Sequence, residues 1–190
     1  MNASRILWLP LAAIMVWGFG GHGPAAAQTP PAAAVPNDAF GEEVTLTEKP
    51  MIYVASSGLW DNAFETIVGA FKTVYGAMEK QGIKPAGAPM TIYTATDDTG
   101  FQFKAAMPVA EAPNLPPGGD VKVGKSPAGR ALKFVHRGSY DAMDTTYDAI
   151  TNYLDEKQLD AMELFIEQYM KDPLATPEDD LVIEIYVPLK

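Results

Sequence analysis

The sequence has no cysteine among its 190 residues and only two histidines, His22 and His136. Disulfide bonds, a cysteine nucleophile and cysteine-based zinc sites are therefore excluded. Two histidines cannot build a multi-histidine metal site, and a Ser-His-Asp triad would have to use His136. No serine stands in a recognisable nucleophile elbow, so His136 is interpreted as structural. The sequence predicts neither a metal nor a cofactor.

Positive charge is also scarce, with 14 Lys and Arg against 24 Asp and Glu. Removal of residues 1–27 would take away Arg5 and no acid, which leaves a net charge of −11. Such a surface repels nucleic acid and anionic lipid and mildly attracts cations. We therefore expect no nucleic-acid partner and, in the mature protein, no membrane partner.

The N-terminus has the pattern of a secretory signal peptide over residues 1–27. Arg5 supplies the positive charge, residues 6–17 are apolar, and the alanines at 25–27 offer a cleavage site. The apolar stretch is short for a spanning helix, so cleavage is favoured over an uncleaved anchor. No cysteine follows for lipidation. We expect a periplasmic or secreted protein, with the Pro/Ala-rich residues 28–42 as a disordered linker.

Residues 43–110 predict a βαββ unit. Alternating patterns indicate strands at 44–46, 51–56, 90–95 and 101–109, with a turn at Asp-Asp-Thr-Gly between the last two. Three-and-four spacing indicates a helix that ends near Gly82 and carries Phe64, Ile67, Val68, Phe71, Val74, Tyr75 and Met78.

Residues 120–190 repeat this order after a linker at 111–119. Strands at 120–123, 130–136, 164–170 and 181–187 surround a helix with Met143, Tyr147, Ile150 and Leu154. Gly58 and Gly138 each open a Gly-x-aromatic-Asp segment, 80 residues apart. The predicted fold class is α+β, with duplicated βαββ units, an antiparallel sheet, a pseudo-twofold axis and a ligand cleft between the repeats.

Two short motifs receive simpler interpretations. Residues 119–126 match the spacing of a phosphate-binding loop, but Pro127 and a predicted strand follow where that loop needs a helix. We interpret this segment as a hairpin turn. The acidic runs at 97–98 and 178–180 lack the ligand spacing of a calcium loop and are interpreted as solvated turns.

Glu167 is an unusual residue for a half-buried strand. Period-two spacing places it between Phe165 and Tyr169 on one face. A buried ionised carboxylate needs a partner, so either this face is wet or Glu167 lines a pocket that receives a cation. Most aromatic residues in such positions are simply core. With Glu167 among them, they could instead wall a pocket for a lipophilic cation; the candidates are Tyr140, Trp60, Tyr169, Phe165, Tyr93 and Tyr53.

Four segments carry a family resemblance: Gly-Arg-Ala at 129–131, His-Arg-Gly-Ser-Tyr at 136–140, Glu-Gln-Tyr-Met-Lys-Asp-Pro at 167–173, and Ile-Tyr-Val-Pro at 185–188. Through them the chain resembles the GyrI-like small-molecule-binding domains, which also serve as effector-binding domains of AraC-type and MerR-type regulators. The likeness is good over residues 120–190 and weaker over 43–110.

The resemblance implies a duplicated βαββ fold whose cleft binds lipophilic, often cationic compounds. It also implies that the pocket glutamate is Glu167 and that the aromatic at the strand–helix junction is Tyr140, whereas Trp60 is supported only by the internal repeat. Some relatives resemble hydrolases that open strained electrophilic rings with a similar glutamate. The export signal and the absence of a DNA-binding domain speak against a transcription regulator.

We therefore expect an exported module that binds small hydrophobic or cationic ligands, with Glu167 as counter-ion. One alternative is a hydrolase in which Glu167 is the general base on water, with its pKa raised by desolvation. Another is a periplasmic protein-interaction or sensing module whose cleft takes a peptide. The identity of the ligand, catalytic turnover and the oligomeric state stay open.

Overall fold

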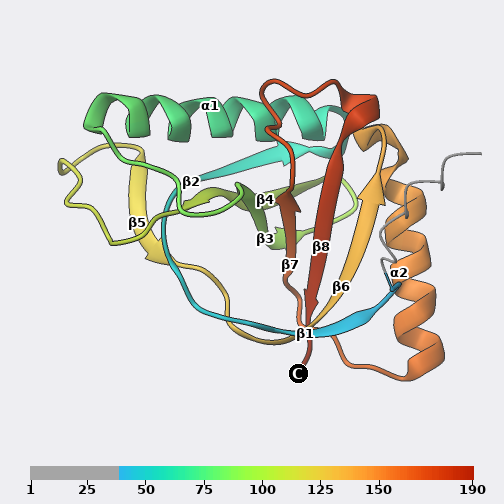
Figure 1. Ribbon diagram of the computed structural model, residues 1–190. Coiled ribbons are helices and arrows are strands. Elements are labelled where there is room, and N and C mark those ends of the chain that lie inside the picture. Colours follow the sequence, from blue (N-terminus) through green and yellow to red (C-terminus); the bar gives the residue numbers. More distant parts are fainter. Residues whose placement is uncertain (1–38) are drawn as a thin grey trace, which may run out of the picture. The chain divides into compact units, whose positions relative to one another are not determined.

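The computed structural model describes residues 39–190 (Figure 1). The strands are β1 Glu42–Leu46, β2 Pro50–Leu59, β3 Met90–Thr96, β4 Gly100–Pro108, β5 Val121–Lys125, β6 Gly129–Arg137, β7 Phe165–Tyr169 and β8 Val182–Pro188. The helices are α1 Ala63–Gln81 and α2 Met143–Lys157, with the 3-10 turns η1 Trp60–Asn62, η2 Tyr140–Ala142 and η3 Glu178–Asp180. Within these residues no helix has the length and hydropathy needed to cross a bilayer.

The predicted signal peptide and most of the predicted linker lie outside the described residues. The last part of that linker prediction belongs to the fold. Glu42 opens β1, and the ring of Phe40 lies 4.8 Å from that of Phe134 and 5.7 Å from that of Tyr153. The folded domain therefore begins slightly before residue 43.

All eight strands form one antiparallel sheet with the order β1-β6-β8-β7-β3-β4-β2-β5. The predicted α+β class with an antiparallel sheet is confirmed. The order β6-β8-β7 on one side of the centre matches β2-β4-β3 on the other, as two βαββ units would give, but duplication of the sequence stays a prediction. The first strand of each half pairs with the other half, because β1 lies beside β6 and β5 beside β2.

This exchange of edge strands corrects the interpretation of residues 119–126. We predicted a hairpin turn, yet β5 pairs with β2, and β6 pairs with β1 and β8. The two strands lie near opposite ends of the sheet, so the segment between them is a crossover. The reason is that β5 pairs with β2 and forms the edge strand of the sheet there, instead of pairing with β6, the next strand in the chain.

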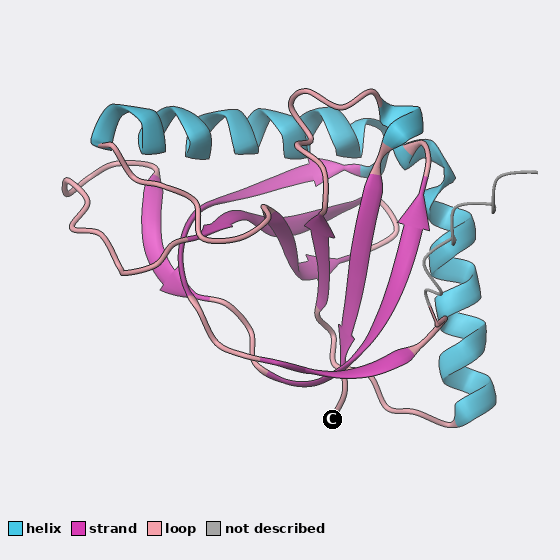
Figure 2. Ribbon diagram, viewed as in Figure 1, coloured by secondary structure: helices cyan, strands magenta, loops and turns pink. Residues whose placement is uncertain are grey.

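Helix α1 forms because Ile67, Phe71, Val74 and Met78 recur on one face and are at most 5% exposed. It ends at Gly82, whose φ of 65° is left-handed, where Ile83 N–H donates to the Met78 carbonyl over 2.9 Å. Helix α2 buries Met143 and Ile150 in the same core, and its N-terminal end lies near that of α1 (Figure 2).

The sheet has apolar residues on both faces. The larger core joins the two helices to strand residues such as Phe103 and Ile183. A smaller cluster on the other face contains Met51, Met90, Ile92, Ala106 and Ile166. Successive side chains of a strand point to opposite faces of the sheet, so neighbouring residues of a strand alternate between the larger core and the smaller cluster.

We predict that Gly100→Ala destabilises the fold by ~1–3 kcal/mol, as overpacking typically does. Gly100 pairs with Leu59 across β2 and β4, and a Cβ there would collide with the backbone carbonyl oxygen of Gly58. The matched control is Gly69→Ala on the exposed face of α1, where a Cβ meets nothing within 4 Å. That change should stabilise by ~0.5–1 kcal/mol. Urea unfolding measures both, and equal effects of the two substitutions would contradict the prediction.

Candidate ligand-binding site

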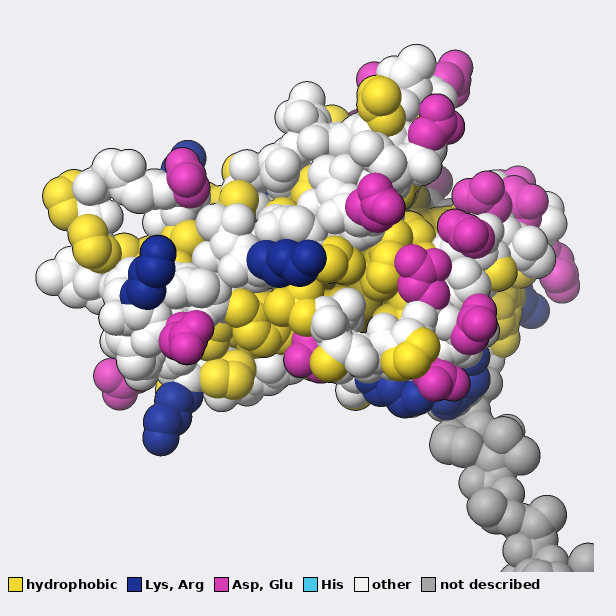
Figure 3. All heavy atoms as spheres, turned by 90° about the horizontal axis from the view of Figure 1, so that it is seen from above, with side chains coloured by type: hydrophobic (Ala, Val, Ile, Leu, Met, Phe, Trp, Pro, Cys, Tyr) yellow, Lys and Arg dark blue, Asp and Glu magenta, His cyan; other side chains and the backbone are white. Residues whose placement is uncertain are grey.

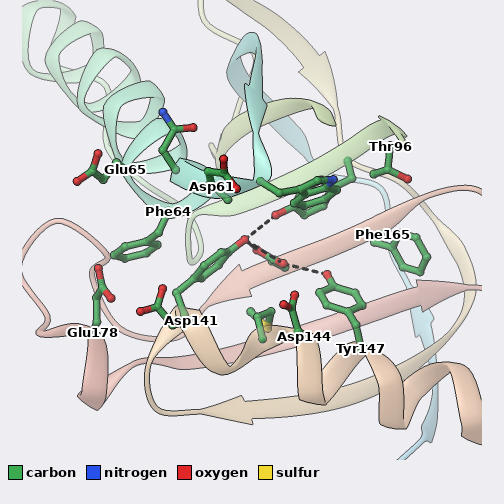
Figure 4. Close-up of a pocket in the computed structure, with 16 residues that line it drawn as sticks. Asp61, Phe64, Glu65, Thr96, Asp141, Asp144, Tyr147, Phe165 and Glu178 are labelled. Atoms are coloured by element: carbon green, nitrogen blue, oxygen red, sulfur yellow. Dashed lines mark hydrogen bonds between the residues drawn. The ribbon is translucent and has the colours of Figure 1, made fainter. Parts of the chain in front are cut away.

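A cavity of about 830 Å³ lies where the two strand–helix junctions meet over the middle of the sheet (Figure 4). Its walls come from η1 and the start of α1 in the first half and from η2 and the start of α2 in the second, with β3 and β7 below and η3 at the side. Its volume suits a drug-sized molecule. The six aromatic residues that line it are Trp60, Phe64, Tyr93, Tyr140, Tyr147 and Phe165.

Glu167 lies on the central strand β7 and is fully buried, at 0% exposure. Its carboxylate accepts hydrogen bonds from the hydroxyls of Tyr147 at 2.9 Å, Tyr169 at 2.9 Å and Tyr140 at 3.1 Å. Tyr147 reaches it from α2 (Figure 4). Three donors from three elements therefore surround one acid.

Tyr93 extends this network by one residue. Its hydroxyl oxygen lies 2.7 Å from that of Tyr140. A tyrosine hydroxyl has one hydrogen, and Tyr140 donates its own to Glu167, so the hydrogen between the two tyrosines comes from Tyr93. The result is a directed chain from Tyr93 through Tyr140 to the carboxylate.

Burial raises the pKa of Glu167 above its ordinary value of 4.5, and the tyrosine hydrogen bonds partly oppose the rise. Burial and, next, the negative charge of Glu167 hold the pKa values of the four tyrosines well above 10; these are Tyr93, Tyr140, Tyr147 and Tyr169. The tyrosines thus stay neutral donors. The floor of the cavity carries one acid whose charge has no cationic partner among the described residues that line it.

The predicted site residues Trp60, Tyr93, Tyr140, Phe165 and Glu167 all line this cavity. Trp60 forms part of the cavity wall and is 42% exposed. Its ring stacks on that of Tyr93, with 6.3 Å between the ring centroids. Its indole N–H donates to the Asp97 carbonyl over 2.7 Å, which fixes the ring against the hairpin of β3 and β4. Tyr169 lies behind the carboxylate, 1% exposed, and does not line the cavity.

Tyr53 lies outside the site, which corrects its inclusion among the predicted pocket residues. It packs on the smaller cluster, on the other face of the sheet, with the Lys104 ammonium 5.0 Å from its ring centroid. Its neighbour Ile52 belongs to the larger core. Successive side chains of β2 point to opposite faces of the sheet, so Tyr53, one residue after Ile52, points away from the cavity.

Five acids from five different elements lie around Glu167 at the cavity lining: Asp61, Glu65, Asp141, Asp144 and Glu178. All five are exposed, and no Lys or Arg within residues 39–190 lines the cavity. Salt bridges elsewhere in the domain join other acids, Glu42, Glu43 and Glu48, to basic residues. On the face shown in Figure 3, Asp and Glu side chains gather at the right, next to an area of hydrophobic surface. The entrance is therefore negatively charged.

The family of the chain is shown by a match that extends over nearly the whole described domain. A sequence model described as the GyrI-like small molecule binding domain matches residues 42–190. The chain belongs to this family. Comparison with curated protein sequences gives no match.

Solved structures share the GyrI-like fold. The C-terminal domain of EcmrR has a TM-score of 0.63 and 14% identity, with 79% of this chain and 96% of that chain covered. SAV2435, bound to tetraphenylphosphonium, has a TM-score of 0.56 and 14% identity over 79% and 93%. A hydrolase from Listeria innocua has a TM-score of 0.54 and 12% identity over 80% and 93%. At these identities the likeness establishes the fold alone.

Tyr147 and Phe64 of this GyrI-like domain also line the cavity, although the sequence did not predict either as a lining residue. Both stood in helical stripes that were interpreted as core. Tyr147 shares its stripe with Met143, Ile150 and Leu154, and its hydroxyl needs a partner that an aliphatic core cannot supply. That hydroxyl was the signal for a polar group nearby.

We predict that Glu167→Gln changes the pH dependence of stability. Because the folded pKa of Glu167 is raised, its contribution is fully present below about pH 4.5 and is lost as the pH rises through the folded value. Glutamine does not titrate, so the variant gains stability relative to wild type over that rise. Urea unfolding at several pH values measures the difference.

The matched control for this experiment is Glu163→Gln, an exposed acid just before β7. We expect little effect of this substitution on stability, because it changes only an exposed surface side chain. A constant difference between wild type and Glu167→Gln across the whole range would show that Glu167 is not desolvated in the folded protein.

Proposed function

We propose that this domain binds lipophilic organic cations in the cavity, with Glu167 as the counter-ion. The observation that carries the proposal is a fully buried carboxylate, bonded to three tyrosine hydroxyls, at the floor of an aromatic cavity that no Lys or Arg of residues 39–190 lines. A buried charge without an opposite charge is costly. A bound cation would supply the missing charge.

The aromatic rings favour a lipophilic cation over a small hydrated one. Each ring face contributes ~0.5–2 kcal/mol to a cation placed over it, most when the cation is desolvated. A small cation loses strong hydration on entry, whereas an organic cation loses little and also buries apolar surface. Trp60, Phe64 and Phe165 offer that apolar contact.

Glu167 would act on the ligand through the tyrosines that cover it, without direct contact. Since the carboxylate has no exposed surface, the ligand meets the tyrosine rings and oxygens first. A phenol that donates to a carboxylate has a more electron-rich ring and oxygen, so Tyr140 and Tyr147 would carry part of the negative charge to the cavity surface. The acids at the entrance would raise the local concentration of cations.

The fold relative SAV2435 was solved with bound tetraphenylphosphonium, which supports this ligand class and supplies a probe. The hydrolase alternative has less support. Glu167 has no exposed surface and lies behind tyrosine hydroxyls, so water could reach it as a general base requires only after a tyrosine moved aside.

We predict that wild type binds tetraphenylphosphonium, as measured by calorimetry, and that Glu167→Gln weakens binding by about tenfold or more, the loss of one charge interaction. The affinity of wild type should rise with pH through the raised pKa of Glu167, because the cation pairs with the ionised form. The variant should lack this rise. Neutral triphenylphosphine oxide is the ligand control and should bind both proteins alike.

Equal tetraphenylphosphonium affinity for wild type and Glu167→Gln would overturn the counter-ion role. Recovery of the bound compounds by mass spectrometry after long incubation distinguishes binding from turnover, since a hydrolase would consume susceptible ligands. Glu163→Gln again serves as the matched protein control, because it removes one acid outside the cavity.

We also propose that the domain is exported to the periplasm or secreted, supported by the signal-peptide pattern of residues 1–27. Expression of the full chain in a Gram-negative host should give a mature protein that begins near Gln28 and is released with the periplasmic fraction. Cell fractionation and N-terminal sequencing measure this. A cytoplasmic protein that retains Arg5 would contradict it.

A further inference from the structure

His136 lies near the end of β6 and is 4% exposed, yet it takes no part in the network around Glu167. Both of its ring nitrogens are bonded. Nδ1 lies 2.8 Å from the hydroxyl of Thr146, and Nε2 lies 3.0 Å from the backbone carbonyl of Ser139. The imidazole therefore links three segments: β6, the turn before η2, and α2.

The partners assign the protons of this ring. A carbonyl oxygen only accepts, so Nε2 carries a hydrogen and donates it to Ser139. In the neutral ring Nδ1 is then the acceptor, and the Thr146 hydroxyl donates to it. Replacement by an apolar side chain would remove both bonds: the half-buried Thr146 hydroxyl would lose its acceptor, while the Ser139 carbonyl would keep only the Ala142 N–H, at 3.0 Å.

The two residues that His136 contacts directly precede the two cavity tyrosines that donate to Glu167. Ser139 is followed by Tyr140, and Thr146 is followed by Tyr147. Both tyrosines donate to Glu167, one from η2 and the other from the second turn of α2. A shift of either segment would move a hydroxyl away from the carboxylate.

We propose that His136 is a positioning residue of the binding site, which fixes Ser139 and Thr146 so that the hydroxyls of Tyr140 and Tyr147 meet on Glu167. Its effect on ligand affinity rests on the proposed function, whereas its effect on the two hydroxyls does not. A hydrogen bond weakens steeply when its donor moves out of line, so small displacements of η2 or α2 are enough to lose it.

Backbone hydrogen bonds hold the turn itself, since Ala142 N–H donates to the Ser139 carbonyl, and the imidazole joins this turn to α2. Gly138 has a φ of 111°, outside the range of regular strand or helix, and its N–H donates to the Leu181 carbonyl over 3.0 Å. The chain thus reverses direction between β6 and η2 at a glycine. The side chain of His136 spans this reversal and reaches one full turn into α2.

Thr146→Val tests the proposal with the least disturbance. It removes the hydroxyl bonded to Nδ1 and keeps the shape of the side chain. The matched control is Thr145→Val, the same change at the adjacent, exposed position of α2. His136→Gln keeps a donor near the position of Nε2, and His136→Leu removes both bonds.

Tetraphenylphosphonium affinity is the first readout, and proton NMR of the tyrosine hydroxyls in the ligand-free protein is the second. We expect Thr146→Val to lose about threefold to tenfold in affinity, the range of one hydrogen bond. It should also shift or lose the hydroxyl resonance of Tyr147. Thr145→Val should match wild type in both. His136→Gln should resemble Thr146→Val, and a folded His136→Leu should lose more than either.

Wild-type affinity and unchanged hydroxyl resonances in Thr146→Val would overturn the positioning role, even if His136→Leu does not fold. If wild type itself does not bind tetraphenylphosphonium, the proposed function fails for this probe. The hydroxyl resonances of Thr146→Val and Thr145→Val then still decide the role of His136, because they require no ligand.

Discussion

The buried carboxylate of Glu167 is the group on which the rest of the site depends. It lies at the centre of the sheet, where the two halves of the domain meet, and its solvent is replaced by hydroxyls of Tyr140, Tyr147 and Tyr169. Removal of an acid from water is costly, and three donors offset only part of that cost. The domain therefore holds an acid beneath an aromatic cavity whose described lining residues include no Lys or Arg.

The fold makes this arrangement possible because it brings two strand–helix junctions together. β2 runs directly into η1, and β6 reaches η2 through a turn at Gly138; η1 and η2 then direct an aromatic residue from each half toward the same cavity. The exchanged edge strands β1 and β5 tie each half to the other. The cavity walls are consequently supported by both halves, while the carboxylate sits on the strand pair β7 and β3 between them.

Most helices and strands can be predicted from the sequence because their patterns are local. The stripe from Ile67 to Met78 and the alternation around Glu167 depend only on helix and strand periodicity. The partner of β5 was not predicted, since pairing between segments as distant as Val54 and Val121 leaves no local trace in the sequence. Nor was Tyr53 assigned to the correct face, because parity along β2 is fixed by which side the helices cover.

The sequence by itself determined the chemistry: an acidic chain without cysteine, with a glutamate between aromatics and the motifs of the GyrI-like family. Only the tertiary structure decided that Glu167 is fully buried and that Tyr147 is one of its three donors. It also decided that His136 links the residues just before Tyr140 and Tyr147. The physical reason is that burial and hydrogen bonding between distant segments arise from packing. Residues 136, 147 and 167 lie on separate elements, and no local pattern in the chain relates them.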